Sequence, residues 1–251
     1  MKVTGIIKHL FVLVSLGLTA VAALAQPGGA SQSAREAGPV DFTGYWVSLV
    51  TEDWRFRMLT APAGDYEGIG LTARGREIAN AWDPQADVAT GNACKAYGAG
   101  GIMRIPTRLH ITWADDNVLQ VDTDAGMQTR LLKFGPAQDN AGAGSLQGVT
   151  SASWLLEREG GRFGPATWGS IEAETTDMAP GYLRRNGVPY GSNAHLTEYY
   201  ELLVGGDGTE YLTVISILED PEHLTQLFTT SSNFKREADG SKWNPEECLA
   251  E

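Results

Sequence analysis

Short segments in which apolar and polar side chains alternate, separated by turn residues, make up most of the chain after residue 106. Residues 107–113, 118–124 and 127–134 follow one another across turns at 114–117 and 125–126. A period of two residues places successive side chains on opposite faces of a strand, so these segments predict consecutive antiparallel hairpins. No regular alternation of strands and helices is visible, which argues against a parallel α/β sheet.

Further strand-like segments and one helix complete the expected fold. The helix is predicted over residues 71–82, where Thr72 can cap its start and Asp83-Pro84 ends it. Strands are also expected at residues 42–50, 146–157, 167–176, 195–204, 210–218 and 225–235, with 54–59 as a second short strand or a continuation after a bulge. About eight to ten consecutive antiparallel strands predict an all-β, up-and-down barrel with one short appended helix. A two-sheet sandwich is the alternative.

The composition is that of one globular domain and excludes some partners. The 251 residues include 42% hydrophobic and 20% charged residues, an ordinary mixture for a folded domain. Nineteen basic and 31 acidic residues give a formal net charge of -12. A field of this sign repels nucleic-acid phosphates and anionic lipids, so we expect no nucleic-acid partner.

Residues 1–25 have the pattern of a cleavable secretory signal. Lys2 and Lys8 precede an apolar run, and Ala23-Leu24-Ala25 supplies small residues at the cleavage point. The alternative is an N-terminal anchor, but the apolar run is short for a membrane-spanning helix. We therefore expect a periplasmic or secreted protein without a membrane span after cleavage. Its expected parts are the signal peptide at 1–25, a flexible leader at 26–40, and a single β-barrel domain with a C-terminal tail at 41–251.

Export decides how the two cysteines are interpreted. Cys94 lies in a glycine-flanked loop and Cys248 lies in the C-terminal tail. In an oxidising compartment an isolated pair forms a disulfide more often than a metal site. We expect a Cys94–Cys248 bridge that ties the tail to the domain. Two free thiols are the alternative.

The two ends of the predicted barrel carry a short motif. Gly44-Tyr45-Trp46 lies near the start of the first strand, and Lys235-Arg236 lies at the end of the last one. This arrangement resembles the Gly-x-Trp and terminal basic residue of the lipocalins, in which the basic side chain packs over the tryptophan. The resemblance implies a lipocalin-like (calycin) barrel closed by Trp46 and Arg236, or by Lys235 in its place. The helix between the second and third strands departs from the lipocalin pattern.

Longer stretches cover nearly the whole mature chain and resemble a family of exported proteobacterial proteins. They are GYWVSLVTEDWRFRM, GNACKAYGAGGIMRIP, RLHITWADDN, DTDAGMQTR, PGYLRRNGVPY and DGSKWNP. No activity is assigned to that family, so the resemblance implies no catalytic residue.

The sequence lacks the motifs that usually mark metal, nucleophile and cofactor sites. Only His110, His195 and His223 remain after signal removal, without HExxH, HxH or a Cys/His cluster. No GxSxG and no GxxxxGK[ST] motif occurs. Turns rich in Asp and Asn lack the spacing and the closing Glu of a calcium loop. We therefore expect neither a metal ion nor a cofactor.

Hairpin register makes one histidine and one arginine candidate catalytic residues. A four-residue turn that pairs Trp113 with Val118 places His110 opposite Val121, and the next turn places Val121 opposite Arg130. If this face points inward, His110 can act as a general acid or base and Arg130 can stabilise an anion. If it points outward, both side chains are solvated. A period of two residues does not decide between the faces.

Two other groups of side chains are candidate ligand contacts. Arg55 and Arg57 alternate with Trp54 and Phe56, which predicts either a solvated charged strand face or a basic pair that binds a carboxylate inside the barrel. The loop at 178–192 is long, and such loops are often lids or binding loops, although its tyrosines could also pack it as a simple rim. The candidate ligand-binding residues are Arg55, Arg57, Tyr97, Tyr182, Arg184 and Tyr190.

Three functions fit this interpretation. The first is an exported barrel that binds a small apolar or aromatic ligand, because 7 Trp and 8 Tyr residues supply wall material. The second is a cofactor-independent lyase, hydratase or isomerase, with His110 and an arginine in the barrel cavity. The third is an interaction module without a cavity, in which the helix plugs the barrel.

Overall fold

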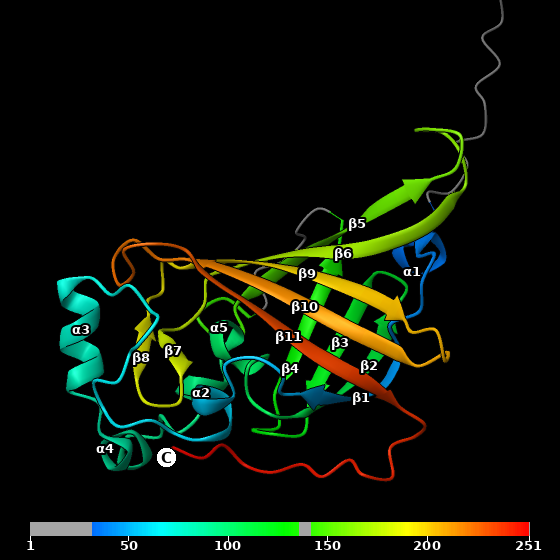
Figure 1. The fold of residues 1–251 in the computed structure, drawn as a ribbon. Helices are drawn as coiled ribbons and strands as arrows, with labels where there is room; N and C mark the ends of the chain where they lie inside the picture. Colours follow the sequence, from blue (N-terminus) through cyan, green and yellow to red (C-terminus); the bar gives the residue numbers. More distant parts are fainter. Residues whose placement is uncertain (1–31, 136–141, 251) are drawn as a thin grey trace, which may run out of the picture. The chain divides into compact units, whose positions relative to one another are not determined.

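A computed structural model describes residues 32–135 and 142–250, so the predicted signal sequence lies outside the described residues. Nine strands form one closed barrel (Figure 1). Its strands are β1 (Gly44–Leu49), β2 (Arg108–Asp115), β3 (Val118–Thr123), β4 (Thr129–Phe134), β5 (Val149–Arg158), β6 (Ala166–Thr176), β9 (His195–Val204), β10 (Glu210–Glu219) and β11 (Phe228–Glu237). Strand β1 closes the barrel because it pairs with β2 on one side and with β11 on the other. The predicted all-β barrel is confirmed.

The sheet order follows the chain, as in an up-and-down barrel, with two departures. Strands β4 and β5 run parallel, with Leu132 opposite Thr150. Their long connection allows this, because it can return the chain to the end of the barrel at which β4 begins. The second departure is a short hairpin, β7 (Gly181–Arg184) and β8 (Val188–Tyr190), inserted between β6 and β9 at one end of the barrel (Figure 1).

The described part of the chain contains several short helices, whereas the sequence predicted a single helix. They are α1 (Ala34–Ala37), α2 (Trp54–Met58), α3 (Ala73–Asn80), α4 (Pro84–Ala89), the 3-10 turn η1 (Lys95–Tyr97) and α5 (Ala99–Ile102). The predicted helix is α3, and Thr72 caps it by accepting a hydrogen bond from the backbone N–H of Gly75. Asp83-Pro84 follows α3 but also begins α4, because proline is favoured at the first position of a helix.

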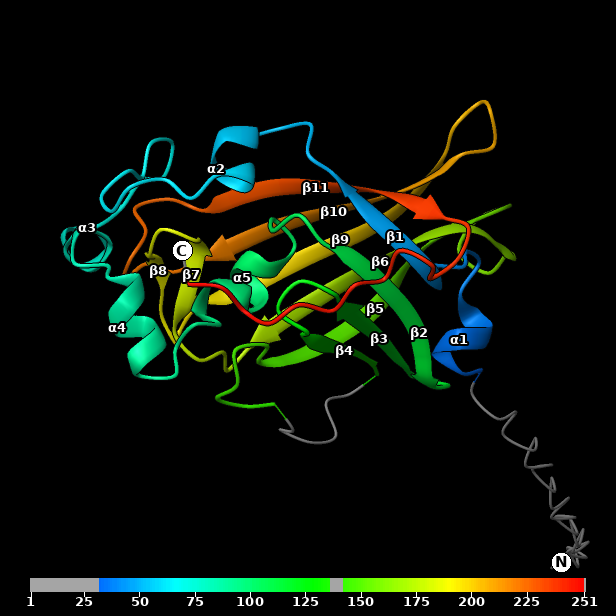
Figure 2. The same ribbon diagram turned by 90° about the horizontal axis from the view of Figure 1, so that it is seen from below.

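Residues 54–58 form helix α2, so the strand predicted at 54–59 is wrong. The chain turns at Asp53, which has a left-handed backbone conformation with φ of 51°. One helical turn then buries Arg57, whose Nε donates to the carbonyl oxygen of Arg104 at 2.8 Å. The same turn exposes Trp54 and Met58. Helix α2 lies beside β11 (Figure 2). Arg55 is at the surface, with Nη2 2.7 Å from Asp65 Oδ2, so it does not form a pair with Arg57 on one strand face.

Part of the predicted flexible leader is ordered against the barrel. Residues 32–40 include helix α1, in which Ser33 accepts a hydrogen bond from the backbone N–H of Glu36. The carbonyl oxygen of Ala34 accepts a hydrogen bond from Trp154 Nε1 at 2.8 Å, and the N–H of Ala34 donates to Asn117. The ordered domain therefore begins before Asp41, and these contacts hold α1 against β5 and the β2–β3 turn.

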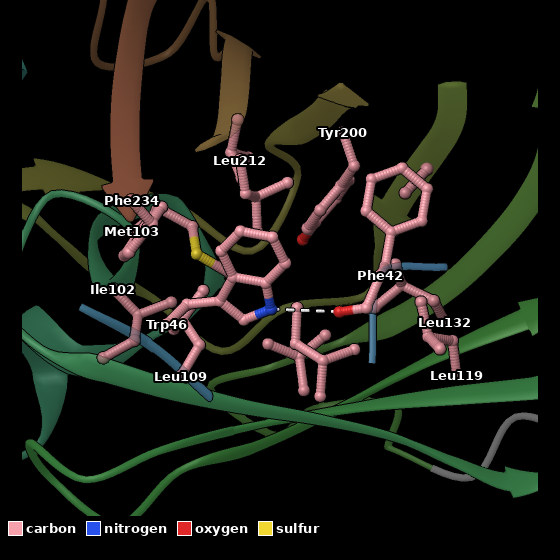
Figure 3. Close-up of a cluster of buried hydrophobic side chains, with 14 of the residues drawn as sticks. Phe42, Trp46, Ile102, Met103, Leu109, Leu119, Leu132, Tyr200, Leu212 and Phe234 are labelled. Atoms are coloured by element: carbon pink, nitrogen blue, oxygen red, sulfur yellow. Dashed lines mark hydrogen bonds between the residues drawn. The ribbon is translucent and has the colours of Figure 1, made fainter. Parts of the chain in front are cut away.

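Large apolar side chains around Trp46 fill the barrel interior (Figure 3). Trp46 is 0% exposed, and its Nε1 donates to the carbonyl oxygen of Phe42 at 3.0 Å. Ile102 and Met103, at the end of α5, belong to the same cluster, so this segment plugs the barrel. The guanidinium of Arg236 lies over the indole, with Cζ 4.1 Å from the ring centroid. This is the contact that the lipocalin resemblance implies.

Cys94 and Cys248 form the predicted disulfide, with their Cα atoms 5.1 Å apart. The tail is also held by main-chain hydrogen bonds. The N–H of Glu246 donates to the carbonyl oxygen of Asp124 at 2.9 Å. The N–H of Leu249 donates to the Tyr97 hydroxyl at 3.1 Å. Because Cys94 directly precedes η1, the bridge fastens the tail to the segment that leads into the plug.

Candidate functional site

The register of the β2–β3 hairpin differs by one residue from the predicted register. A bulge between Trp113 and Asp115 shifts the pairing, so His110 lies opposite Asp122 rather than opposite Val121. A shift of one residue moves a side chain to the other face of the sheet. His110 is therefore on the outside of the barrel, which is one of the two orientations that the sequence left open, and the predicted pairing with Val121 is wrong.

Arg130 does pair with Val121 as predicted, but it points inward while His110 points outward. The imidazole of His110 stacks on the ring of Tyr45, with centroids 4.2 Å apart, and meets the edge of Trp243. The two predicted catalytic residues thus occupy opposite faces of the sheet and cannot act on one ligand.

Inside the barrel, Arg130 belongs to a buried ion pair. Its Nη2 lies 2.6 Å from Glu198 Oε2, and both side chains are 0% exposed. Arg130 also donates to the hydroxyls of Tyr200 and Thr175, each at 3.3 Å. Burial alone would lower the pKa of Arg130, but the adjacent Glu198 carboxylate raises that pKa above its ordinary value. Arg130 therefore stays charged, and neither Arg130 nor Glu198 lines the clefts described next.

The other predicted ligand contacts lie around the β7–β8 hairpin. Tyr182 and Tyr190 line one cleft, here named the tyrosine cleft. Arg184 and Arg55 line a second one, here named the arginine cleft. Tyr97 lines neither, because its ring is buried among the core residues at the plugged end of the barrel. Arg57 lines neither cleft either, so the structure divides four of the six predicted binding residues between two separate clefts.

The tyrosine cleft lies between α3, the β7–β8 hairpin and the loop after β10, and its volume is about 300 Å³. A volume of this size is at the lower end of the range for small-molecule sites. Its apolar lining is Ile78, Pro180, Pro189 and the rings of Tyr182 and Tyr190, and its polar lining includes Arg74, Lys95, Ser192, Glu222 and His223.

Asp220 fixes the imidazole of His223 at the wall of this cleft. His223 Nδ1 lies 2.8 Å from Asp220 Oδ2, and the same oxygen accepts a hydrogen bond from the N–H of Gly191 at 2.8 Å. The side chains of His223 and Asp220 are 6% and 1% exposed. Nδ1 is the ring nitrogen that has a partner within the described ranges, which leaves Nε2 available to a ligand.

A second hydrogen-bonded group in the cleft consists of Tyr182, Asp87 and Lys95. The hydroxyl of Tyr182 donates to Asp87 Oδ2 at 2.8 Å, and Lys95 Nζ donates to Asp87 Oδ1 at 3.3 Å. Burial and the hydrogen bond to Asp87 raise the pKa of Tyr182 above its ordinary value. The phenol therefore remains neutral, and its ring forms a fixed wall of the cleft.

Tyr190 separates the tyrosine cleft from the barrel plug. Its hydroxyl occupies the space in which a Cβ at Gly98 or Gly181 would stand, at 2.2 and 2.5 Å. These two positions therefore require glycine, which explains part of the glycine-rich sequence around η1 and α5. Burial raises the pKa of Tyr190 to about 12.

The sequence analysis did not select His223, Asp220 or Lys95. A local signal for the first two exists, since Asp220-Pro221-Glu222-His223 places a carboxylate and an imidazole three residues apart in a turn. No local signal places Lys95 in the cleft, because its position depends on how the segment after Cys94 packs against β7.

Among residues 32–135 and 142–250, no group of three or more His, Cys, Asp or Glu side chains is arranged to hold a metal ion. Within the same ranges, no helix has the length and apolar character needed to cross a membrane.

These observations define the class of the protein as all-β, with a closed nine-stranded barrel whose interior holds the side chains of a plug segment. Comparisons with protein-family models, with curated proteins and with solved structures find no match to this chain. The kinship with lipocalins that the sequence suggested stays a prediction.

Proposed function

We propose that the protein binds a small, largely apolar ring compound that carries a hydroxyl group, and that it does so in the tyrosine cleft. The observation that carries this proposal is the His223 imidazole, which Asp220 holds through Nδ1 in the wall that it shares with the two tyrosines. With Nδ1 donating to the carboxylate, Nε2 accepts a hydrogen bond from the ligand hydroxyl.

The charges of the cleft favour a neutral ligand over an anion. Lys95 lies 3.3 Å from Asp87, and Arg74 lies 2.8 Å from Glu222. His223 is likewise held by a carboxylate. Each basic side chain of the cleft therefore has an acidic partner, and a ligand carboxylate would have to compete with it.

We further propose that binding takes place outside the cytoplasm. The signal predicted at 1–25 supports this location, and a disulfide between Cys94 and Cys248 is stable in an oxidising compartment. N-terminal sequencing of protein recovered from the extracytoplasmic fraction tests the location, with Gln26 expected as the first residue. An intact Met1 on that material contradicts it.

Two matched probes, phenol and anisole, test the ligand chemistry by isothermal titration calorimetry. Both offer a ring, but only phenol can donate to His223, so phenol is expected to bind several-fold more tightly, in line with one net hydrogen bond. His223→Ala should abolish this preference. Tyr182→Ala should weaken both probes, whereas Tyr182→Phe, which keeps the ring, should weaken neither much.

His110→Ala is the matched control, because His110 lies on the outer face of the barrel and lines neither named cleft. Equal binding of phenol and anisole in the wild type, or a preference for phenol that survives in His223→Ala, contradicts the proposal. Native mass spectrometry of protein purified from its own source then identifies the natural occupant.

The Asp220–His223 pair favours one second candidate function, proton transfer to or from the bound molecule. A carboxylate-held imidazole is a usual general base, and Asp220 would stabilise the imidazolium that forms. This candidate replaces the enzyme hypothesis built on His110 and Arg130. Its test is exchange of deuterium from heavy water into the natural ligand; exchange that continues in both His223→Ala and Asp220→Asn contradicts it.

A further inference from the structure

Buried guanidinium groups gather at the arginine cleft, and none of them belongs to the tyrosine cleft. It lies between α2, the segment before α3, the end of β7 and the start of β11, and its volume is about 590 Å³. Arg104 and Arg184 line it, and Arg57 lies directly behind, donating to the carbonyl oxygen of Arg104. The side chains of Arg57, Arg104 and Arg184 are only 1%, 8% and 5% exposed.

The three buried arginines lie among carboxylates. Asp53 accepts a hydrogen bond from Arg104 and lies 3.7 Å from Arg184, and Glu52 lies 3.1 Å from Arg57. Burial and repulsion from Arg104 lower the pKa values of Arg57 and Arg184, whereas Asp65 and Glu67 act on Arg184 in the opposite direction. Because Asp65 and Glu67 also pair with Arg55, the cleft is close to electrically balanced, and a ligand carboxylate would take the place of one of these contacts.

Two buried N–H groups in this cluster have no acceptor within the described residues. They are Nη2 of Arg57 and Nε of Arg184. Leaving a buried donor without a partner costs free energy, and the cost is larger for a charged group. Because Arg184 lines the cleft, an oxyanion placed there can approach its guanidinium directly.

The carboxylate of Asp53 lies where such an oxyanion would bind, and the backbone of Asp53 is strained. Its φ of 51° is left-handed, which is uncommon for a residue other than glycine and occurs often at functional sites. Its carboxylate is 31% exposed, whereas its partners Arg104 and Arg184 are buried. An external carboxylate can therefore share or replace this contact without opening the core.

The walls of the cleft suit an aromatic body attached to the anion. The guanidinium of Arg184 lies 3.7 Å from the centroid of the Phe56 ring, and that of Arg55 lies 4.8 Å from the same ring. Phe228 also lines the cleft, and Cζ of Arg104 lies 5.4 Å from the centroid of the Phe228 ring. The acidic lining residues disfavour a doubly charged ligand such as phosphate.

We infer that the arginine cleft is a second binding site, and that it takes an aromatic monocarboxylate through Arg104 and Arg184. The ring of the ligand packs against Phe56 and Phe228, and its carboxylate lies beside Asp53. This site is independent of the tyrosine cleft, whose bound ligand we propose to be neutral.

Calorimetric titrations with benzoate, benzyl alcohol and inorganic phosphate at constant ionic strength test the inference. Benzoate is expected to bind at least tenfold more tightly than either of the others, since benzyl alcohol lacks the charge and phosphate lacks the ring. His223→Ala should leave benzoate affinity unchanged, which separates this site from the tyrosine cleft. Phosphate binding as tight as benzoate would overturn the choice of ligand.

Variants of the cleft locate the bound carboxylate. Arg184→Gln should lower benzoate affinity about tenfold or more, as expected for loss of a charged hydrogen bond. Arg185→Gln is the matched control, because Arg185 is adjacent in the chain and does not line the cleft. Asp53→Asn should raise benzoate affinity several-fold, because it removes the competing charge.

A further variant keeps the test decisive if Arg184→Gln fails to fold. Thr229 is exposed at the rim of the cleft, so Thr229→Trp should fill the cleft and abolish benzoate binding without removing an arginine. The inference is overturned if benzoate binds no more tightly than benzyl alcohol. It is equally overturned if benzoate affinity survives in a folded Arg184→Gln or Thr229→Trp variant.

Discussion

Removing the charge of Glu198 tests how far the barrel depends on the ion pair at its centre. Glu198→Gln keeps the size and one hydrogen-bonding oxygen of the side chain but leaves Arg130 without an opposing charge. Arg130 cannot respond by losing its proton at accessible pH, because a guanidinium group stays protonated in proteins. The substitution therefore leaves an uncompensated positive charge in the barrel core.

The expected cost follows from the complete burial of both partners. Loss of one partner of a buried pair costs about 3 to 5 kcal/mol. The double variant Arg130→Met/Glu198→Leu removes both charges but leaves the hydroxyl of Tyr200 without its two partners, which costs about 1 to 3 kcal/mol. The double variant should therefore be more stable than Glu198→Gln alone.

Urea unfolding followed by circular dichroism measures both differences in the free energy of unfolding. Glu174→Gln is the control, because Glu174 is exposed on the outer face of β6 and its loss should change stability by no more than about 0.5 kcal/mol. A cost for Glu198→Gln below about 1 kcal/mol would refute the reasoning. So would a double variant less stable than the single one.

Three further predictions concern stability. Trp46→Ala should lower the free energy of unfolding by about 3 to 5 kcal/mol in urea titrations, because it empties the centre of the core and removes the partner of Arg236. A loss of less than about 1 kcal/mol would contradict a packed interior. Reducing Cys94–Cys248 opens a loop of 154 residues and should cost about 2 to 5 kcal/mol, measured by unfolding with and without reductant; equal midpoints contradict this. Burial raises the pKa of Tyr190 from 10.0 to about 12, so its contribution to stability is complete below pH 10 and lost as the pH rises through 12. Phenolate absorbance in an alkaline titration should show Tyr190 ionising with or after unfolding, and early ionisation in the folded protein contradicts the assignment.

The barrel and its disulfide could be predicted from the sequence because each rests on a signal that extends along the chain. Alternation repeated over many strands specifies consecutive pairing, and a predicted secretory signal together with two cysteines favours one bridge. The Trp46–Arg236 contact was implied by the resemblance of the first and last strands to the lipocalin pattern. None of these expectations depends on the position of a single turn residue.

The predicted row of His110, Val121 and Arg130 was wrong because its placement did depend on one turn. A bulge between Trp113 and Asp115 moved His110 to the outer face, and no residue pattern in the turn distinguishes a four-residue connection from a shorter one beside a bulge. The strand predicted at residues 54–59 was wrong for a related reason, since five residues of alternating charge and aromaticity fit a helical turn as well as a strand.

The two clefts could not be predicted because distant segments build them. Lys95, Tyr182 and His223 come from the η1 segment, the inserted hairpin and the loop after β10. The length of the loop at 178–192 suggested either a binding loop or a packed rim, and so made Tyr182 and Arg184 candidates. Their partners are set by tertiary packing, which local patterns do not report.

The pairing of β1 with β11 has a consequence for the order of folding. Tyr45 faces Glu237 across that seam, so the barrel closes between the first and the last of its strands. Because the chain is synthesised from its N-terminus, one edge of β1 stays unpaired until β11 has been synthesised. Closure is thus a contact of very long sequence separation, which slows folding and places it after release of the whole chain. The Cys94–Cys248 bridge also needs the C-terminal tail, so it can form only after Cys248 has emerged.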